Sequence, residues 1–354
     1  MSSHLFYIFI VTLMLIKSTT SSNGLGFIVI GDWGGKDSPP YYKDAQVKAA
    51  AGMSKVATDI NANFIMALGD NFYYDGVEES DSTRFADTWE QVYITPYPSL
   101  QKPWYICAGN HDWHGNVSAQ IEYSKTNQYW KFPDFNYDWV ETFTNDKGET
   151  KSIQFVMIDT ILLTGNTAET DPEDVNYFQQ PTMDGWTTLA KQNEIVTYLE
   201  QILSQSTADF ILVSGHYPVY SPCKHGNTDS MHKTVKPLLE QYNAHYLCGH
   251  DHCLAHANDE GVEYVLSGMA DECCYEAPPK NIESVKNLDF MVALGHNPTK
   301  AVSGFTSITS QIEDGTDSLK VEYHDQDGNV LFTKSLAMSA HAAALRKSKA
   351  AAGK

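Results

Sequence analysis

The chain is poor in positive charge for its length of 354 residues. It has 24 lysine and arginine residues against 44 aspartate and glutamate residues, which gives a formal net charge of −20 and a pI near 4.9. A protein that binds nucleic acid through its phosphates needs a basic surface, so this composition argues against a nucleic-acid partner. It favours a protein that repels anionic surfaces.

Long apolar segments are also scarce. The one clear run covers residues 5–16 and is followed by small polar residues over 18–22; no lysine or arginine precedes it. Such a run is too short for a comfortable membrane span and suits the core of a secretory signal peptide. We predict a signal peptide over residues 1–22, with a signal anchor or a buried helix as the alternatives, and no stable membrane insertion after cleavage.

Internal repeats and linkers rich in proline and glycine are absent from the sequence. Without such a break we predict one domain over residues 23–337, and we expect a monomer. The last segment, residues 338–354, is basic and of low complexity. It is typical of a disordered tail or of a short surface helix.

Cysteine occurs at six positions, which a secreted protein can use for disulfide bonds: Cys107, Cys223, Cys248, Cys253, Cys273 and Cys274. Their pairing cannot be deduced from the sequence alone. We expect only that the adjacent Cys273 and Cys274 do not readily bridge each other. The sequon NVS, which begins at Asn116, predicts N-glycosylation.

Apolar, β-branched runs recur along the chain, and most end in polar turns with glycine: LGFIVIGD, NFIMALGD, KPWYICAGN, SIQFVMID, ADFILVSGH and AHYLCGH. Amphipathic, helix-like segments lie over residues 44–60, 186–205 and 230–243. This alternation predicts an α/β fold with a mostly parallel sheet covered on both faces. After residue 260 the strand-like runs are separated by tight turns such as DQDG, which predicts an antiparallel sheet.

The polar residues that end five of these runs are of the types that bind metals. Each follows a glycine: Asp32, Asp70, Asn110, His216 and His250. In open α/β sheets ligands bind beyond the carboxyl ends of the strands, so the five turns can meet at one edge. A single turn of this kind is ordinary, but the five together predict a metal site of carboxylate, amide and imidazole ligands.

Two further candidate ligands lie close by in the sequence. His252 is two residues after His250, so both side chains face the same side of an extended segment, and Tyr73 follows Asp70 across a turn. A carboxylate can bridge two cations, and a tyrosinate favours a trivalent one. Two metals roughly 3.5–4 Å apart form the clamp that serves in-line attack on phosphorus.

Five blocks, GDWG, GDNFY, GNHD, GHYPVYS and GHDH, follow one another in this order. With them the sequence resembles the purple acid phosphatases, within the calcineurin-like metallophosphoesterases, over about residues 25–335. The small, single-domain, tartrate-resistant type is the most similar. The resemblance implies a metallophosphoesterase-type β-sandwich of mixed sheets flanked by helices, in four αββα layers. It also implies an acid phosphatase, secreted or in a lysosome or vacuole, that hydrolyses small phosphate monoesters, with phosphoproteins as a further candidate class.

The resemblance further implies a binuclear centre of Fe(III) with Fe(II), Zn(II) or Mn(II). Three residues would bind the ferric ion: Asp32, Tyr73 and His252. Three would bind the divalent ion: Asn110, His216 and His250. Asp70 would bridge the two ions.

Two histidines outside this ligand set, His111 and His225, would bind phosphate and are the candidates for protonating the leaving alkoxide. Asp112 and His114 would either orient ligands or be structural. His256, the third histidine of the segment GHDHCLAH, is expected to be structural.

The sequence departs from this type at one loop. Small tartrate-resistant enzymes often tether the loop after the fourth strand by a disulfide bond, and that loop lies over the active site and can restrain activity until it is cleaved. Here the corresponding residues, 160–185, contain no cysteine and are acidic. They would suit a mobile flap, and the tether is not expected.

Two other functions stay open. One is a phosphodiesterase or nucleotide pyrophosphatase on the same fold, because motifs alone do not select the leaving group. The other is a catalytically silent, secreted metal-binding protein. Substrate profiling separates the first from a monoesterase, and measured turnover excludes the second.

Overall fold

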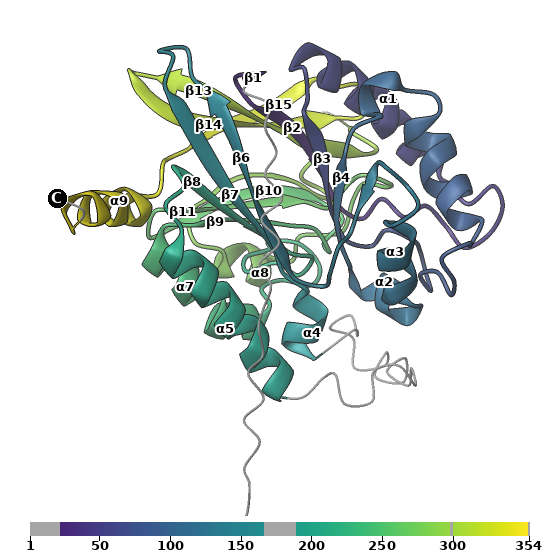
Figure 1. Cartoon of the computed structure of the whole chain (residues 1–354). Helices are drawn as coiled ribbons and strands as arrows, with labels where there is room; N and C mark the ends of the chain where they lie inside the picture. The colour runs from purple at the N-terminus through teal and green to yellow at the C-terminus, as the bar shows by residue number, and fades with distance from the viewer. Residues whose placement is uncertain (1–21, 166–188, 298–299, 353–354) are drawn as a thin grey trace, which may run out of the picture.

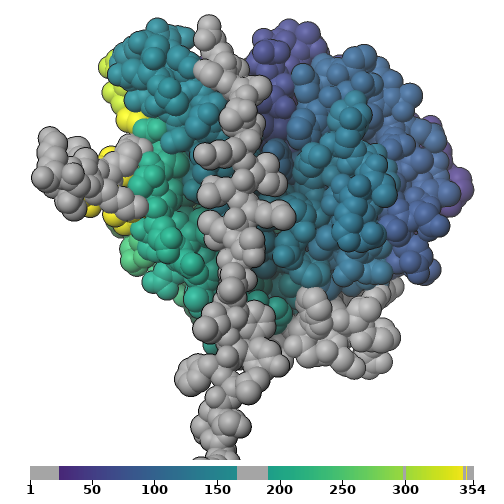
Figure 2. Space-filling view, viewed as in Figure 1, coloured from purple at the N-terminus to yellow at the C-terminus, as the bar shows by residue number. Residues whose placement is uncertain are grey.

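The computed structural model describes residues 22–165, 189–297 and 300–352. Two mixed β-sheets pack against each other, with helices along their outer sides (Figure 1). In the space-filling view the blue residues of one half and the teal to green residues of the other lie side by side (Figure 2). The predicted α/β sandwich of mixed sheets flanked by helices is confirmed.

The larger sheet has eight strands within the described residues, in the spatial order β1-β6-β7-β8-β9-β11-β10-β12. Their bounds are Ser22–Asn23 (β1), Tyr137–Thr144 (β6), Thr150–Met157 (β7), Phe210–Ser214 (β8), His245–Cys248 (β9), Val262–Ser267 (β11), Leu254–Asp259 (β10) and Leu288–Val292 (β12). Strands β7, β8, β9 and β11 are parallel to one another, whereas β6 is antiparallel to β7 and β10 is antiparallel to both β11 and β12.

The smaller sheet has seven strands in this part of the chain, in the order β15-β14-β13-β2-β3-β4-β5. Their bounds are Val330–Leu336 (β15), Thr316–Asp325 (β14), Gly304–Glu313 (β13), Gly26–Ile30 (β2), Phe64–Leu68 (β3), Trp104–Cys107 (β4) and Trp130–Lys131 (β5). Strands β2 to β5 are parallel, and β13 to β15 add an antiparallel half.

The expectation of one mostly parallel sheet followed by an antiparallel one is therefore wrong. The parallel strands are divided between two sheets, and the later strands extend both of them. A strand can be buried on both faces in two ways: between two layers of helices, or between a layer of helices and a second sheet. Its sequence is a continuous apolar run in both cases. Periodicity could not separate these two arrangements.

Helices flank the sheets as the sequence predicts, with shifted bounds. The α-helices of the described residues are Asp44–Asp59 (α1), Asn110–His114 (α2), Val117–Tyr123 (α3), Thr160–Thr164 (α4), Leu189–Gln205 (α5), Asp229–Thr234 (α6), Lys236–Tyr242 (α7), Pro279–Ser284 (α8) and Ala340–Ala352 (α9). A π-helix covers Phe85–Ile94 (η1) and a 3-10 helix covers Pro98–Leu100 (η2). The predicted helix over 230–243 is two helices, because Pro237 has no N–H to continue the first one and starts the second.

Aromatic rings fill the space between the two sheets. Phe27 of β2 and Phe64 of β3 stack with their centroids 4.8 Å apart, and both meet Phe155 of β7 edge-on at 5.4 Å. Tyr105 of β4 stacks on Trp139 of β6 at 4.0 Å. Such pairs contribute about 0.5–1.5 kcal/mol each beyond the burial of their surface. They hold in place two sheets that both contribute to the site described below.

The described residues leave out most of the N-terminal segment and include most of the C-terminal one. The predicted signal peptide, apart from Ser22, lies outside the described residues, as does most of the loop over 160–185. Among the helices of the described residues, none combines the length and apolarity that a membrane span needs. The basic C-terminal segment forms α9, so of the two predicted alternatives it is a helix. The helix is anchored by Ser339, whose N–H donates to the Asp209 carbonyl and whose hydroxyl donates to the Tyr242 carbonyl.

The cysteines pair in two ways. Cys223 is bonded to Cys253, which connects the loop after β8 to the start of β10, while Cys107 and Cys248 are buried free thiols. The expectation that Cys273 and Cys274 do not readily bridge each other is wrong. Their sulfur atoms are bonded to each other, and the peptide bond between the two residues is cis.

We expect the Cys223–Cys253 bond to stabilise the fold measurably. It closes a segment with a sequence separation of 30 residues, so its removal relaxes the unfolded chain. The double variant Cys223→Ala/Cys253→Ala should lose about 3 kcal/mol in the free energy of unfolding, measured by denaturant titration. Cys107→Ala is the control for loss of a buried sulfur atom. Equal losses in the two variants would show that the cross-link contributes nothing.

Candidate metal centre

The five strand ends singled out by the sequence meet at one edge of the molecule. Three belong to the smaller sheet, where Asp32 follows β2, Asp70 follows β3 and Asn110 follows β4. Two belong to the larger sheet, where His216 follows β8 and His250 follows β9. The edge is therefore shared between two sheets, and parallel strands within each sheet bring the carboxyl ends together.

The turns at this edge have unusual backbone conformations. Asp32, Asp70 and His250 are non-glycine residues with φ values of 56°, 51° and 77°. Left-handed conformations cost such residues free energy and are concentrated at functional sites. Gly69 and Gly109 allow the β3 and β4 turns to touch, since a Cβ at Gly109 would collide with the carboxylate of Asp70.

Three of the predicted ferric ligands lie in mutual contact. The Tyr73 hydroxyl lies 3.2 Å from Asp32 Oδ1 and 2.8 Å from His252 Nε2. His252 Nε2 is 3.6 Å from the same Asp32 oxygen. All three side chains are buried. One phenol oxygen, one carboxylate oxygen and one imidazole nitrogen therefore converge on a point.

The three predicted divalent-ion ligands form a second group. Asn110 Oδ1 lies 3.0 Å from His216 Nε2 and 3.2 Å from His250 Nδ1. His216 Nδ1 lies 2.8 Å from the carbonyl oxygen of Leu68, which only accepts, so that nitrogen carries the proton and Nε2 keeps its lone pair. The Asn110 Nδ2 atom is buried without a hydrogen-bond partner among the described residues. The group thus presents one amide oxygen and two imidazole nitrogens.

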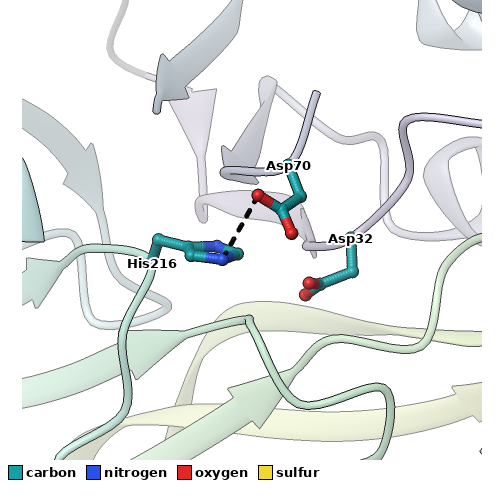
Figure 3. A group of neighbouring side chains, drawn as sticks. All are labelled: Asp32, Asp70 and His216. Atoms are coloured by element: carbon teal, nitrogen blue, oxygen red, sulfur yellow. Dashed lines mark ion pairs between the residues drawn. The ribbon is translucent and has the colours of Figure 1, made fainter. Parts of the chain in front are cut away.

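Asp70 stands between the two groups. Its Oδ1 atom is 3.4 Å from His216 Nε2, and one ligand atom each from Asp32, Asp70 and His216 lies within 4.8 Å of the other two (Figure 3). Figure 3 shows the Asp70 carboxylate pointing into the space between Asp32 and His216. Seven donors thus form two sets of three that share one carboxylate, which is an arrangement suited to two cations.

The burial of the Asp32 and Asp70 carboxylates beside each other favours a bound cation. Burial, reinforced by the charge of Asp70, raises the pKa of Asp32 well above its usual range. Burial would also raise the pKa of Asp70, but when His216 and His111 are protonated, without a metal, their charges outweigh burial and lower that pKa. Burial and then the charge of His225 lower the pKa of His250 well below its usual range, so this imidazole is neutral and able to donate a lone pair.

The donor set therefore fits metal ions. Within the described residues, the ion-pairing partners of Asp32 and Asp70 are histidines, His252 and His216. A bound cation would allow both carboxylates to be ionised and would use the imidazole lone pairs. Mixed oxygen and nitrogen donors suit iron, zinc and manganese, and the tyrosine on one side suits a trivalent ion.

The two histidines predicted to act on phosphate flank this cluster. The His111 N–H donates to Asp70 Oδ1 at 3.0 Å, and its ring lies 4.8 Å from the Tyr73 ring. The His225 ring lies 4.4 Å from the His250 ring. Both are half-buried, whereas the donors between them are buried. They border the two sides of the cluster.

Other residues from the sequence lie outside the cluster. His256 is buried, with Nδ1 2.9 Å from the Tyr323 hydroxyl and Nε2 2.9 Å from Glu263 Oε2. Asp112 accepts bonds from the turns around it rather than from a donor of the cluster. Asn116 caps α3 by accepting from Ala119, and its glycosylation stays a prediction.

Sequence reasoning missed a layer of residues behind His252. Glu272 Oε1 lies 3.2 Å from His252 Nδ1, and Lys43 forms ion pairs with Glu272 and with the buried Asp271. The Tyr275 ring stacks on the His252 ring at 4.2 Å. Glu272 stands in the segment ADECCYE and Lys43 precedes a helix, and neither carries a motif or spacing that could have marked it.

Comparison with known proteins agrees with this geometry. The family model described as Calcineurin-like phosphoesterase matches residues 25–254. The tartrate-resistant acid phosphatase type 5 of Rattus norvegicus is 34% identical over 325 residues, which cover 91% of this chain and 93% of that protein. The protein of the same name from Homo sapiens is 40% identical over 252 residues, covering 70% and 73% of the two chains.

A solved structure shares the fold at lower sequence identity. GAP50, described as the anchor in the inner membrane complex of Plasmodium, superimposes with a TM-score of 0.72 at 21% identity over 90% of each chain. At that identity the likeness speaks for the fold alone. The chain therefore belongs to the purple acid phosphatase family, of the small tartrate-resistant type, and is a phosphoric monoester hydrolase within the calcineurin-like phosphoesterases, as shown by its matched motifs, its sequence identity over most of the chain and its paired donor groups.

Proposed function

We propose that this chain is a secreted acid phosphatase that hydrolyses small phosphate monoesters with an Fe(III)–M(II) centre, where M is iron, zinc or manganese. The observation that supports it most is the sharing of Asp70 between two sets of three donors. Asp32, Tyr73 and His252 would hold the ferric ion. Asn110, His216 and His250 would hold the divalent ion. Two bound cations supply Lewis acidity toward phosphate oxygens and activate water for attack on phosphorus.

His111 is positioned to hold a proton at one particular atom. Its Nδ1 atom lies 2.8 Å from the carbonyl oxygen of Tyr74. A carbonyl only accepts, so Nδ1 carries a proton and Nε2 is the nitrogen whose protonation can change. In the proposed reaction the protonated Nε2 binds a phosphate oxygen or gives its proton to the leaving alkoxide.

His225 is held at the opposite side of the cluster. Its N–H donates to Asp251 Oδ1 at 3.0 Å, and Asp251 also accepts a bond from the Ser221 hydroxyl. The Cys223–Cys253 bond ties the same loop to the residue after His252. In our proposal this anchoring keeps the His225 imidazole beside the phosphate.

Secretion is part of the proposal and rests on the apolar run over residues 5–16. An oxidising compartment also suits the Cys223–Cys253 bond. The strong negative charge argues against a nucleic-acid partner, and we propose a monomer.

Colour and metal content test the proposal directly. The iron-loaded, oxidised protein should contain two metal ions per chain and absorb visible light through charge transfer from the Tyr73 phenolate to Fe(III). Tyr73→Phe should remove the absorption band and leave the fold intact, as measured by absorption spectroscopy with metal analysis. Tyr105→Phe, which changes a tyrosine of strand β4, is the control. An active, iron-containing protein without colour would refute Tyr73 as a ligand.

Removal of the shared carboxylate should disable the centre. Asp70→Asn leaves the size of the side chain unchanged but takes away the charge placed between the two donor groups. We expect at least one metal ion to be lost and turnover of an alkyl phosphate to fall by several orders of magnitude, as for a catalytic unit that works as a whole. Full occupancy of both ions in this variant would contradict the bridging role.

Replacement of His111 should separate chemistry from metal binding. His111→Ala should keep both metals and the visible band, while turnover of an alkyl phosphate falls by about 10²–10⁴-fold. A nitrophenyl phosphate, whose leaving group needs a proton less, should lose less activity. His296→Ala, a change at an exposed histidine, serves as the control. Loss of a metal ion from His111→Ala would make His111 a ligand instead, and greater activity on diesters than on monoesters would favour a diesterase.

A further inference from the structure

A short segment after β11, residues 271–275, is bonded along the Tyr73 side of the donor cluster. The Asp271 N–H donates to the Asp32 carbonyl at 3.1 Å, and the Tyr275 N–H donates to the His252 carbonyl at 2.9 Å. Between them, the Cys273 N–H donates to the Val302 carbonyl at 2.7 Å. Bonds at every second residue hold the backbone of this segment beside two of the predicted ferric ligands.

The side chains of this segment fix the His252 ring from two directions. Glu272 Oε1 lies 3.2 Å from His252 Nδ1, at the edge of the ring. The Tyr275 ring covers the face at a centroid distance of 4.2 Å and an interplanar angle of 5°. A carboxylate accepts, so Nδ1 carries the proton and the lone pair is on Nε2, which points at the Tyr73 hydroxyl 2.8 Å away.

Lys43 keeps the Glu272 carboxylate in this place. Its Nζ atom lies 2.6 Å from Glu272 Oε2 and 3.1 Å from Asp271 Oδ2, and it is 5.6 Å from the centre of the Tyr73 ring. The Glu272 side chain is 43% exposed and would be free to rotate into solvent without such a partner, whereas Asp271 is fully buried. Lys43 is itself fixed as the residue before α1, where its N–H donates to Gln46.

We propose that Glu272 is a positioning residue for His252 and that Lys43 holds Glu272 in position. A carboxylate on the second nitrogen of a ligand histidine sets the orientation and tautomer of the ring and makes it a stronger donor. Glu272 thus strengthens binding of the trivalent ion by the Asp32, Tyr73 and His252 group without touching the ion. This inference rests on the proposed ferric centre, to which it adds a residue that no motif marks.

The test compares the iron-loaded, full-length protein with Glu272→Gln and with Glu276→Gln. Glu276→Gln is the control: it removes the same charge four residues further along the chain, at an exposed position. Each protein is titrated with EDTA at one pH, and the ferric iron retained is followed by the visible band and by metal analysis. The free energy of unfolding is measured alongside.

We expect Glu272→Gln to release iron at a chelator concentration about 10–100-fold lower than the wild type does, because partners of ligand histidines have effects of this size. Its visible band should move to longer wavelength, since iron with a weaker histidine donor accepts the tyrosinate electron more readily. Glu276→Gln should match the wild type in both respects. A Glu272→Gln protein with the band and chelator resistance of Glu276→Gln would overturn the inference and leave the ferric centre standing. A wild-type protein that holds no iron would overturn both.

A double-variant cycle tests the part played by Lys43. If Lys43 acts through Glu272, Lys43→Met should lower the chelator resistance of the wild-type protein. Added to Glu272→Gln, the same substitution should change the chelator resistance less than about twofold. Equal effects in the two backgrounds would show that Lys43 acts independently of Glu272, and would refute its proposed role.

Discussion

Two aspartates buried side by side are the constraint on which the rest of this structure depends. Asp32 and Asp70 belong to neighbouring strands, lie with their oxygens close together and pair with histidines in the described part of the chain. Two carboxylates in a site of low dielectric cannot both be ionised without positive charge nearby. Bound cations would supply that charge, and metal binding would then stabilise the turns around the site.

Backbone conformation and hydrogen bonds of the surrounding structure keep these donors in place. The turns that carry Asp32, Asp70 and His250 adopt left-handed conformations, which packing on both sides maintains. His216 is oriented by the Leu68 carbonyl and His252 by Glu272. Because the two sheets are held together by aromatic rings such as Phe64 and Phe155, donors from both sheets keep their spacing.

The groups proposed to act on substrate lie at the border of the cluster and not within it. His111 is connected to Asp70 through its backbone, while its ring is fixed by the Tyr74 carbonyl. His225 is connected to the cluster through Asp251 and the neighbouring disulfide bond. In the proposed function, this separation would let the buried donors bind cations while two half-buried imidazoles exchange protons.

The sequence by itself determined the α/β class and the strand ends that meet at one edge. It also predicted the seven side chains that the structure brings together there, because each lies in a short turn after an apolar run and is of a residue type that binds metals. It also indicated His111, which stands in the block GNHD, and His225 through the family resemblance. Only the tertiary structure decided that the parallel strands form two sheets, that Cys223 pairs with Cys253, and that Lys43 and Glu272 stand behind His252. The physical reason is the range of the interactions: turn chemistry and burial patterns are local, whereas the partner of a strand, a thiol or a charge lies far away in the sequence and leaves no local pattern.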